Sequence, residues 1–166
     1  MWVLAIDTAT PRPGLAIAGK NREDQRPLPT GRRSSEALLP GIEDILAAAS
    51  LSLGDVGRIA VCSGPGSFTG IRVGLATAWG LSRARPIPIE TFGSLEAVAE
   101  IARGTGVLRV CPSFEAERED VYFGEYDLES PRAAEIRAPM LLPRDALSEA
   151  CPSGSLGLPL GAAIPG

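Results

Sequence analysis

A glycine-rich segment at residues 64–74, Gly-Pro-Gly-Ser-Phe-Thr-Gly-Ile-Arg-Val-Gly, limits the folds open to this chain more than any other feature. Residues 57–63 before it have the composition of a buried strand, and residues 75–81 after it have helical periodicity. A strand, a tight turn and a helix N-terminus leave backbone N–H groups that bind an anion or a partner's carboxylate. Glycine also lets a second backbone come very close, because it has no Cβ. The sequence leaves open whether this turn binds a ligand or partner, or is only a tight turn.

The composition is that of a soluble protein with one compact domain or two small lobes. The 166 residues are enough for a real core, and 45% of them are hydrophobic and 22% charged. No apolar run approaches the roughly 20 residues that span a bilayer. Residues 1–7 carry Asp7 and no basic residue, which indicates a first strand and not a signal peptide. We therefore expect a cytoplasmic protein with no membrane contact.

The sequence contains no histidine, which excludes Ser-His-Asp and Cys-His catalysis and every histidine-ligated metal site. The three cysteines, Cys62, Cys111 and Cys151, form no Cys-x-x-Cys pair and are predicted to be small buried hydrophobic residues. The net charge of −4 and the pI near 4.9 argue against a broad nucleic-acid-binding face. If the protein serves a nucleic acid, we expect a partner to make the contact.

The first half of the chain alternates strand and helix patterns. Strands are predicted at residues 2–7 and 15–18 around a turn of hydroxyl, Pro and Gly residues, with a short edge strand near residues 26–28. An amphipathic helix follows, with Ser34 or Ser35 as its N-cap, and its apolar positions are Leu38, Leu39, Ile42, Ile45, Leu46 and Ala49. Pro40 predicts a kink in this helix, or a later start.

The helix after the glycine-rich turn carries two adjoining stripes. Gly70, Gly74 and Ala78 form a ridge of small residues on which a neighbouring helix could pack closely. Ile71, Leu75 and Trp79 repeat beside it. Such apolar stripes serve either the core or an interface, and both interpretations stay open at this point.

The second half of the chain is less regular. A strand is predicted at residues 86–89, a helix at 94–103, and strands at 107–111 and 121–126 around the acidic stretch 115–120. The Gly-Thr-Gly sequence at 104–106 is the best boundary, so we expect an N-terminal lobe at 1–103 and a shorter C-terminal lobe at 104–166. The Gly- and Pro-rich tail leaves room for only a turn or two of helix, near 144–150.

The order of these elements resembles the actin- and hexokinase-type ATPase (ASKHA) superfamily, in which the first hairpin holds an acidic residue and hydroxyls near a phosphate. Residues 5–10, 33–40 and 64–81 resemble the TsaB (YeaZ) family. The likeness is clear over residues 1–103 and looser over 107–126. It implies an α/β actin-like ATPase (ribonuclease H-like) fold, with a mixed sheet flanked by helices and a shortened second lobe.

The resemblance also implies a role. TsaB is similar to TsaD, the subunit that threonylcarbamoylates adenosine 37 of tRNA, but lacks its metal-binding histidines. The implied role is a non-catalytic scaffold of that transferase, with a TsaD-like subunit and a TsaE-like ATPase as partners and a homodimer when alone. Contact with tRNA is expected to be only indirect. No metal or cofactor is expected to be required, and ATP or ADP is expected, if anywhere, at the interface of the complex.

Two sets of site residues follow from this likeness. The implied partner interface uses the first two helices, at Leu38, Leu39, Ile42, Ile45, Leu46, Gly70, Ile71, Gly74, Leu75, Ala78 and Trp79. A nucleotide- or phosphate-type loop is expected at Asp7, Thr8, Thr10, Gly64, Gly66, Ser67 and Thr69. For Asp7, a purely structural role in capping its own turn remains an alternative.

The sequence departs from the family in two places. Ser34 stands where the family usually has histidine, and Glu117 stands where it commonly has the arginine of an Asp-Ala-Arg motif.

The alternative function is an independent small ATP-dependent kinase, in which Asp7 and Thr8 hold metal and phosphate. That function needs a second carboxylate, for which Glu115 and Asp120 are available. A peptidase is disfavoured, because there is no histidine to activate a nucleophile.

Overall fold

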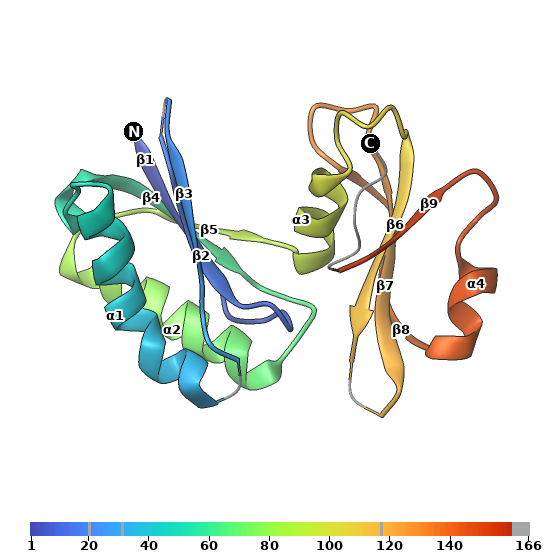
Figure 1. The fold of residues 1–166 in the computed structure, drawn as a ribbon, viewed down its shortest axis with the longest axis horizontal. Coiled ribbons are helices and arrows are strands. Elements are labelled where there is room, and N and C mark those ends of the chain that lie inside the picture. Colours follow the sequence, from blue (N-terminus) through green and yellow to red (C-terminus); the bar gives the residue numbers. More distant parts are fainter. Residues whose placement is uncertain (20, 31, 117, 161–166) are drawn as a thin grey trace. The chain divides into compact units, whose positions relative to one another are not determined.

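The chain forms two compact units, Met1–Phe92 and Gly93–Gly166, in a computed structural model that describes residues 1–19, 21–30, 32–116 and 118–160 (Figure 1). The division lies before the helix at residues 94–101, whereas the sequence predicted it after residue 103. The reason is packing: this helix buries Leu95, Val98 and Ala99 in the core of the second unit. The Gly-Thr-Gly turn is therefore a connection within that unit.

The first unit is a five-stranded mixed sheet in the order β3-β2-β1-β4-β5. Its strands are β1 (Trp2–Asp7), β2 (Gly14–Ala18), β3 (Glu23–Pro27), β4 (Val56–Cys62) and β5 (Ile89–Phe92). Strands β1, β2 and β3 pair antiparallel, and β4 pairs parallel with both β1 and β5. This arrangement is the mixed sheet that the sequence predicted.

Helices α1 (Arg32–Ala48) and α2 (Phe68–Ala84) cover one face of this sheet (Figure 1). A short 3-10 turn, η1 (Leu53–Asp55), leads from α1 into β4. Alternate strand residues point into the core beneath the helices, as the strand period of two requires. The buried strand residues of this core include Leu4, Ile6, Leu15, Ile17, Ile59 and Val61.

Helix α1 and strand β5 differ from the sequence prediction. Helix α1 begins at Arg32, so Ser34 and Ser35 lie inside it and are not its N-cap. It continues through Pro40, whose side chain is exposed, so the proline ring faces solvent and not the core. Strand β5 begins at Ile89 and not at residue 86, because the proline there and Pro88 have no N–H to pair. The carbonyl of Pro88 still accepts the N–H of Ile59, at 3.0 Å.

The second unit is a four-stranded sheet in the order β8-β7-β6-β9. Helix α3 (Ser94–Ile101) packs its apolar side on Val110, Phe114 and Tyr126. The remaining elements are β6 (Arg109–Glu115), β7 (Asp120–Asp127), β8 (Ala134–Pro143), η2 (Arg144–Ala146), α4 (Leu147–Ala150) and β9 (Leu156–Pro159). Neither β8 nor β9 was predicted from the sequence, because most β8 residues are exposed without alternation, and β9 is short and contains Gly and Pro.

Within the described residues, none of the helices combines the length and the apolar character that crossing a membrane would require.

Candidate functional site

The predicted phosphate-type residues do come together, where the loop after β1 meets the N-terminus of α2. The N–H of Ser67 donates to the carbonyl of Ala9 at 2.7 Å, and the hydroxyl of Thr8 donates to the carbonyl of Gly70 at 2.6 Å. Gly66 (φ +152°) has no room for a side chain, because a Cβ there would overlap the Ala9 carbonyl. The sequence-predicted turn is thus a tight joint between two loops of the chain itself.

The ridge of small residues on α2 serves this joint. Gly70, Gly74 and Ala78 are all buried. A Cβ on Gly70 would overlap the Thr8 carbonyl, and one on Gly74 would lie 2.6 Å from the Thr8 hydroxyl. The prediction that this ridge receives a neighbouring helix is therefore wrong: it receives the β1 loop and the sheet, which come close only because side chains are small here.

The Asp7 carboxylate caps its own turn. One oxygen accepts the N–H groups of Ala9 and Thr10, at 2.8 and 3.2 Å, and the other accepts the Thr10 hydroxyl at 2.6 Å. This pattern favours the structural role that the sequence left open for Asp7. Burial, with a smaller contribution from the negative charge of Asp7, raises the pKa of the neighbouring Cys62 thiol to about 12, so the thiol is protonated at neutral pH.

The remaining loop residues shape the start of α2. Ser67 is the N-cap, and its hydroxyl oxygen accepts the N–H of Gly70 at 3.2 Å. Gly64 adopts φ +99°, a backbone conformation that favours glycine. Thr69 is exposed in the first turn of the helix. A bound anion would have to share this helix end with the bonds that the two loops already make.

An apolar stripe lies on the solvent side of α2. Phe68, Leu75 and Trp79 are 67%, 36% and 65% exposed. The guanidinium of Arg72 lies 3.7 Å from the centre of the Phe68 ring. Since these four residues are spaced by four, three and four positions, they share one helical face. We call Phe68, Arg72, Leu75 and Trp79 the outer stripe.

The predicted interface residues fall into an exposed group and a buried group. Leu75 and Trp79 belong to the outer stripe, Leu39 on α1 is exposed, and Ile71 is half-buried. By contrast, four predicted interface residues of α1 lie in the core and have no free surface to offer a partner, namely Leu38, Ile42, Ile45 and Leu46. Phe68 was not among the predicted interface residues, although its spacing from Arg72 and Leu75 places it on the same helical face.

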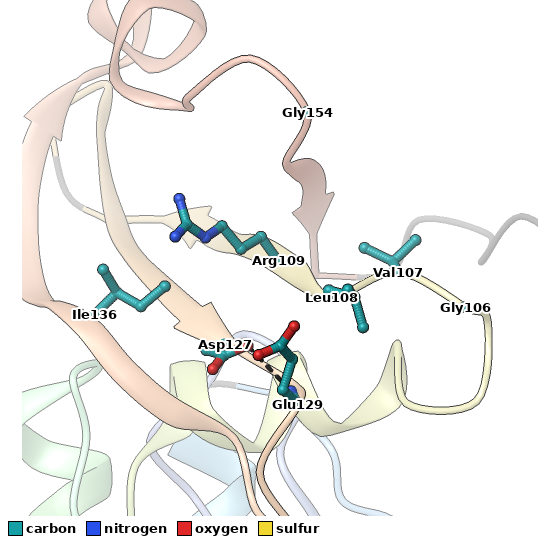
Figure 2. Close-up of a pocket in the computed structure, with 8 residues that line it drawn as sticks. All are labelled: Gly106, Val107, Leu108, Arg109, Asp127, Glu129, Ile136 and Gly154. Carbon is teal, nitrogen blue, oxygen red and sulfur yellow. Dashed lines mark hydrogen bonds between the residues drawn. The ribbon is translucent and has the colours of Figure 1, made fainter.

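Two surface hollows lie away from these residues. The larger, of about 650 Å³, is in the second unit and is lined by Gly106, Val107, Leu108, Arg109, Asp127, Glu129, Ile136 and Gly154 (Figure 2). The smaller, of about 400 Å³, lies between residues 11–15 and the segment 25–30. None of the sequence-predicted site residues lines either hollow. Among the described residues, no three Cys, Asp or Glu side chains gather as a metal ion would require.

The departures from the family motifs lie largely outside the described structure. The side chain of Ser34 and the whole of Glu117 are not described. Glu115 is described, and its carboxylate accepts a hydrogen bond from Arg144 at 2.9 Å. This ion pair is exposed on the second unit and engages one of the two candidates for the second carboxylate that the kinase alternative requires.

Known proteins resemble this chain over most of its length. The family model of TsaD, tRNA N6-adenosine threonylcarbamoyltransferase, matches residues 21–146. The tRNA threonylcarbamoyladenosine biosynthesis protein TsaB of Escherichia coli (strain K12) is 35% identical over 127 residues, which are 76% of this chain and 55% of that protein. TsaB of Bacillus subtilis (strain 168) is 32% identical over 127 residues, with the same two shares. The chain thus spans about half the length of these relatives.

A solved structure gives the same result. YeaZ from Pseudomonas aeruginosa matches with a TM-score of 0.77 and 31% identity, over 86% of this chain and 67% of that chain. This match, with the strand orders described above, confirms the predicted α/β actin-like ATPase fold, and the second sheet has one strand fewer than the first. By its sequence and its structure alike, the chain belongs to the TsaB (YeaZ) family.

Proposed function

We propose that this chain is a non-catalytic subunit in the synthesis of N6-threonylcarbamoyladenosine in tRNA, and that it docks on a TsaD-like catalytic subunit through the outer stripe of α2. The names of its relatives support a role in the synthesis of threonylcarbamoyladenosine in tRNA. The docking proposal rests on the composition of the outer stripe. Its exposed Trp79 and Phe68, with Arg72 stacked on the Phe68 ring, are of the residue types that are enriched in protein interfaces.

The joint between the two loops supports a structural and not a chemical role for this unit. The Asp7 carboxylate at the joint accepts hydrogen bonds from the turn that follows it, and the nearby Cys62 thiol is protonated at neutral pH. The joint fixes the start of α2 and so the direction of the outer stripe. In this proposal a TsaE-like ATPase joins the complex in the cytoplasm, ATP or ADP binds if at all at the interface of the complex, and tRNA is reached through the partners.

The test is reconstitution of tRNA modification with the cognate TsaD-like, TsaE-like and threonylcarbamoyl-adenylate-forming proteins, with and without this chain. Product nucleoside is expected only when the chain is present. Leu75→Glu and Trp79→Glu should abolish both product and capture of the TsaD-like subunit, since each places a charge in an apolar contact. Leu141→Glu is the matched control, because Leu141 is also an exposed apolar residue but lies on β8 of the second unit.

Two results would contradict the proposal. Product that is unaffected by omission of the chain would remove it from the pathway. Full activity of the two α2 variants would remove the outer stripe from docking. ATP turnover by the isolated chain that disappears in Asp7→Ala would instead favour the kinase alternative, in which the Asp7 loop and not the stripe is the site.

A further inference from the structure

The second unit brings two of the three cysteines together, although they are far apart in the sequence. Cys111 lies in β6 and pairs with Gly157 of β9, and it is only 2% exposed. Cys151 is half-buried and directly follows α4. Between Cys151 and β9 the chain makes a tight turn, in which the N–H of Ser155 donates to the carbonyl of Pro152 at 3.1 Å. This turn returns the chain to β6, and the side chains of Cys111 and Cys151 lie within hydrogen-bond reach of each other.

Arg137 contacts a residue next to each of the two thiols. Arg137 donates to the carbonyl of Ala150, the residue before Cys151, at 3.2 Å. Its other terminal nitrogen lies 3.6 Å from the carboxylate of Glu125. Glu125 is buried on β7, and the pairing of Val110 with Tyr126 on the neighbouring strands places it opposite Cys111. The segment that carries Cys151 is thus held against the strands that carry Cys111 and Glu125.

The two sulfurs differ in how a reagent reaches them. Burial raises the pKa of the Cys111 thiol, and the adjacent Cys151 thiol and the charge of Glu125 raise it further. Cys111 therefore stays protonated and shielded, whereas Cys151 has exposed surface. A solvent-accessible thiol beside a shielded partner is the arrangement in which the first reacts with an external oxidant and the second resolves the product.

We propose that Cys111 and Cys151 are a redox pair that a small external disulfide, such as glutathione disulfide, converts into an intramolecular disulfide bond. In the first step the Cys151 thiolate attacks one sulfur of the reagent, the S–S bond of the reagent breaks, and one glutathione thiolate leaves. In the second step Cys111 loses its proton to that thiolate or to solvent and attacks the Cys151 sulfur, which releases the second glutathione. Two protein thiols are oxidised and one external disulfide is reduced to two thiols.

The new bond would join β6 to the segment between α4 and β9. It would thereby fix the edge strand β9, which pairs only with β6 in the described sheet. The third cysteine provides an internal control: Cys62 belongs to the first unit, is 1% exposed and lies beside Asp7. Glutathione disulfide is expected to leave it as a free thiol.

The experiment is to incubate the whole chain with glutathione disulfide, alkylate all remaining thiols in denaturant and map the tryptic peptides by mass spectrometry. Trypsin separates the two cysteines, because Arg118 and Arg137 lie between them. Two of the three thiols should become resistant to alkylation and appear as one Cys111–Cys151 cross-linked peptide pair. Cys62→Ser should give the same cross-linked pair and leave no thiol to alkylate. Cys151→Ser should give no cross-link, whereas Cys111→Ser should retain one glutathione on Cys151.

The wild-type peptide map decides the proposal even if a variant at the buried Cys111 fails to fold. Three alkylatable thiols after oxidation would overturn it. A wild-type product that stops at glutathione on Cys151, or a cross-link that involves Cys62, would also overturn it, because either result means that Cys111 does not resolve the first intermediate.

Discussion

At the scale of single residues, the glycines of the family motif are explained by contacts within the chain. Gly66 and Gly70 each lie so close to a carbonyl of the β1 loop that a Cβ would overlap it. The sequence predicted a close backbone approach here but not its partner, because residues far apart in sequence supply the two sides. The same limit applies to Asp7, whose three hydrogen bonds are local, whereas its neighbour Cys62 comes from another strand.

The first prediction concerns Gly70, with Gly80 as the control in the same helix. Gly70→Ala should lower the free energy of unfolding by about 3 kcal/mol, because the added methyl group has to displace the Thr8 carbonyl. Gly80→Ala should raise it by up to about 1 kcal/mol, since nothing lies within 4 Å of that position and alanine favours the helix. Urea unfolding of both variants measures the difference. Equal stabilities would show that the loop joint is not as tight as described.

A second prediction concerns Glu100 on α3. Its carboxylate accepts hydrogen bonds from Arg103 and from the N–H of Ala133, and the bond from Arg103 is the largest cause of its lowered pKa. A lowered folded-state pKa stabilises the protein above the ordinary value of 4.5, and this stabilisation is lost as the pH falls through the folded-state value. Glu100→Gln should therefore be less stable than the wild type near neutral pH, with a difference that shrinks in acid. A constant difference between urea unfolding curves across that range would contradict this.

At the scale of elements, periodicity predicted both helices of the first unit but not which face of each is covered. In α1 all the predicted apolar positions except Leu39 are buried, and Leu38, Ile42 and Ile45 belong to the core between the helix and the sheet. In α2 the small residues take that place, so the larger Leu75 and Trp79 remain outside. A sequence shows that a helix has an apolar stripe and a ridge of small residues beside it. Which of the two packs on the sheet depends on the tertiary structure.

The strands that the sequence predicted are those with an apolar pattern within their own residues. The buried strands β1 and β4 are rich in apolar residues and were predicted at nearly their observed bounds. Strand β8 is exposed along most of its length, and it exists because β7 offers it a partner edge. Strand β9 is short and rests on parallel pairing with β6. Elements stabilised mainly by non-local pairing leave little trace in the sequence that encodes them.

At the scale of the whole molecule, the outer stripe predicts self-association. A single face that carries Phe68, Leu75 and Trp79 is complementary to a second copy of itself about a two-fold axis, and apolar patches of this kind rarely stay in contact with water. The chain alone should therefore form a homodimer that dissociates on dilution. Trp79→Glu should be monomeric, because two charges would face each other across a dry contact. Leu141→Glu, on β8, should still dimerise. Sedimentation equilibrium over a range of concentrations gives the three masses. A wild-type monomer at the highest concentration would count against the stripe as an interface. Dimers in all three proteins would place the interface on another surface.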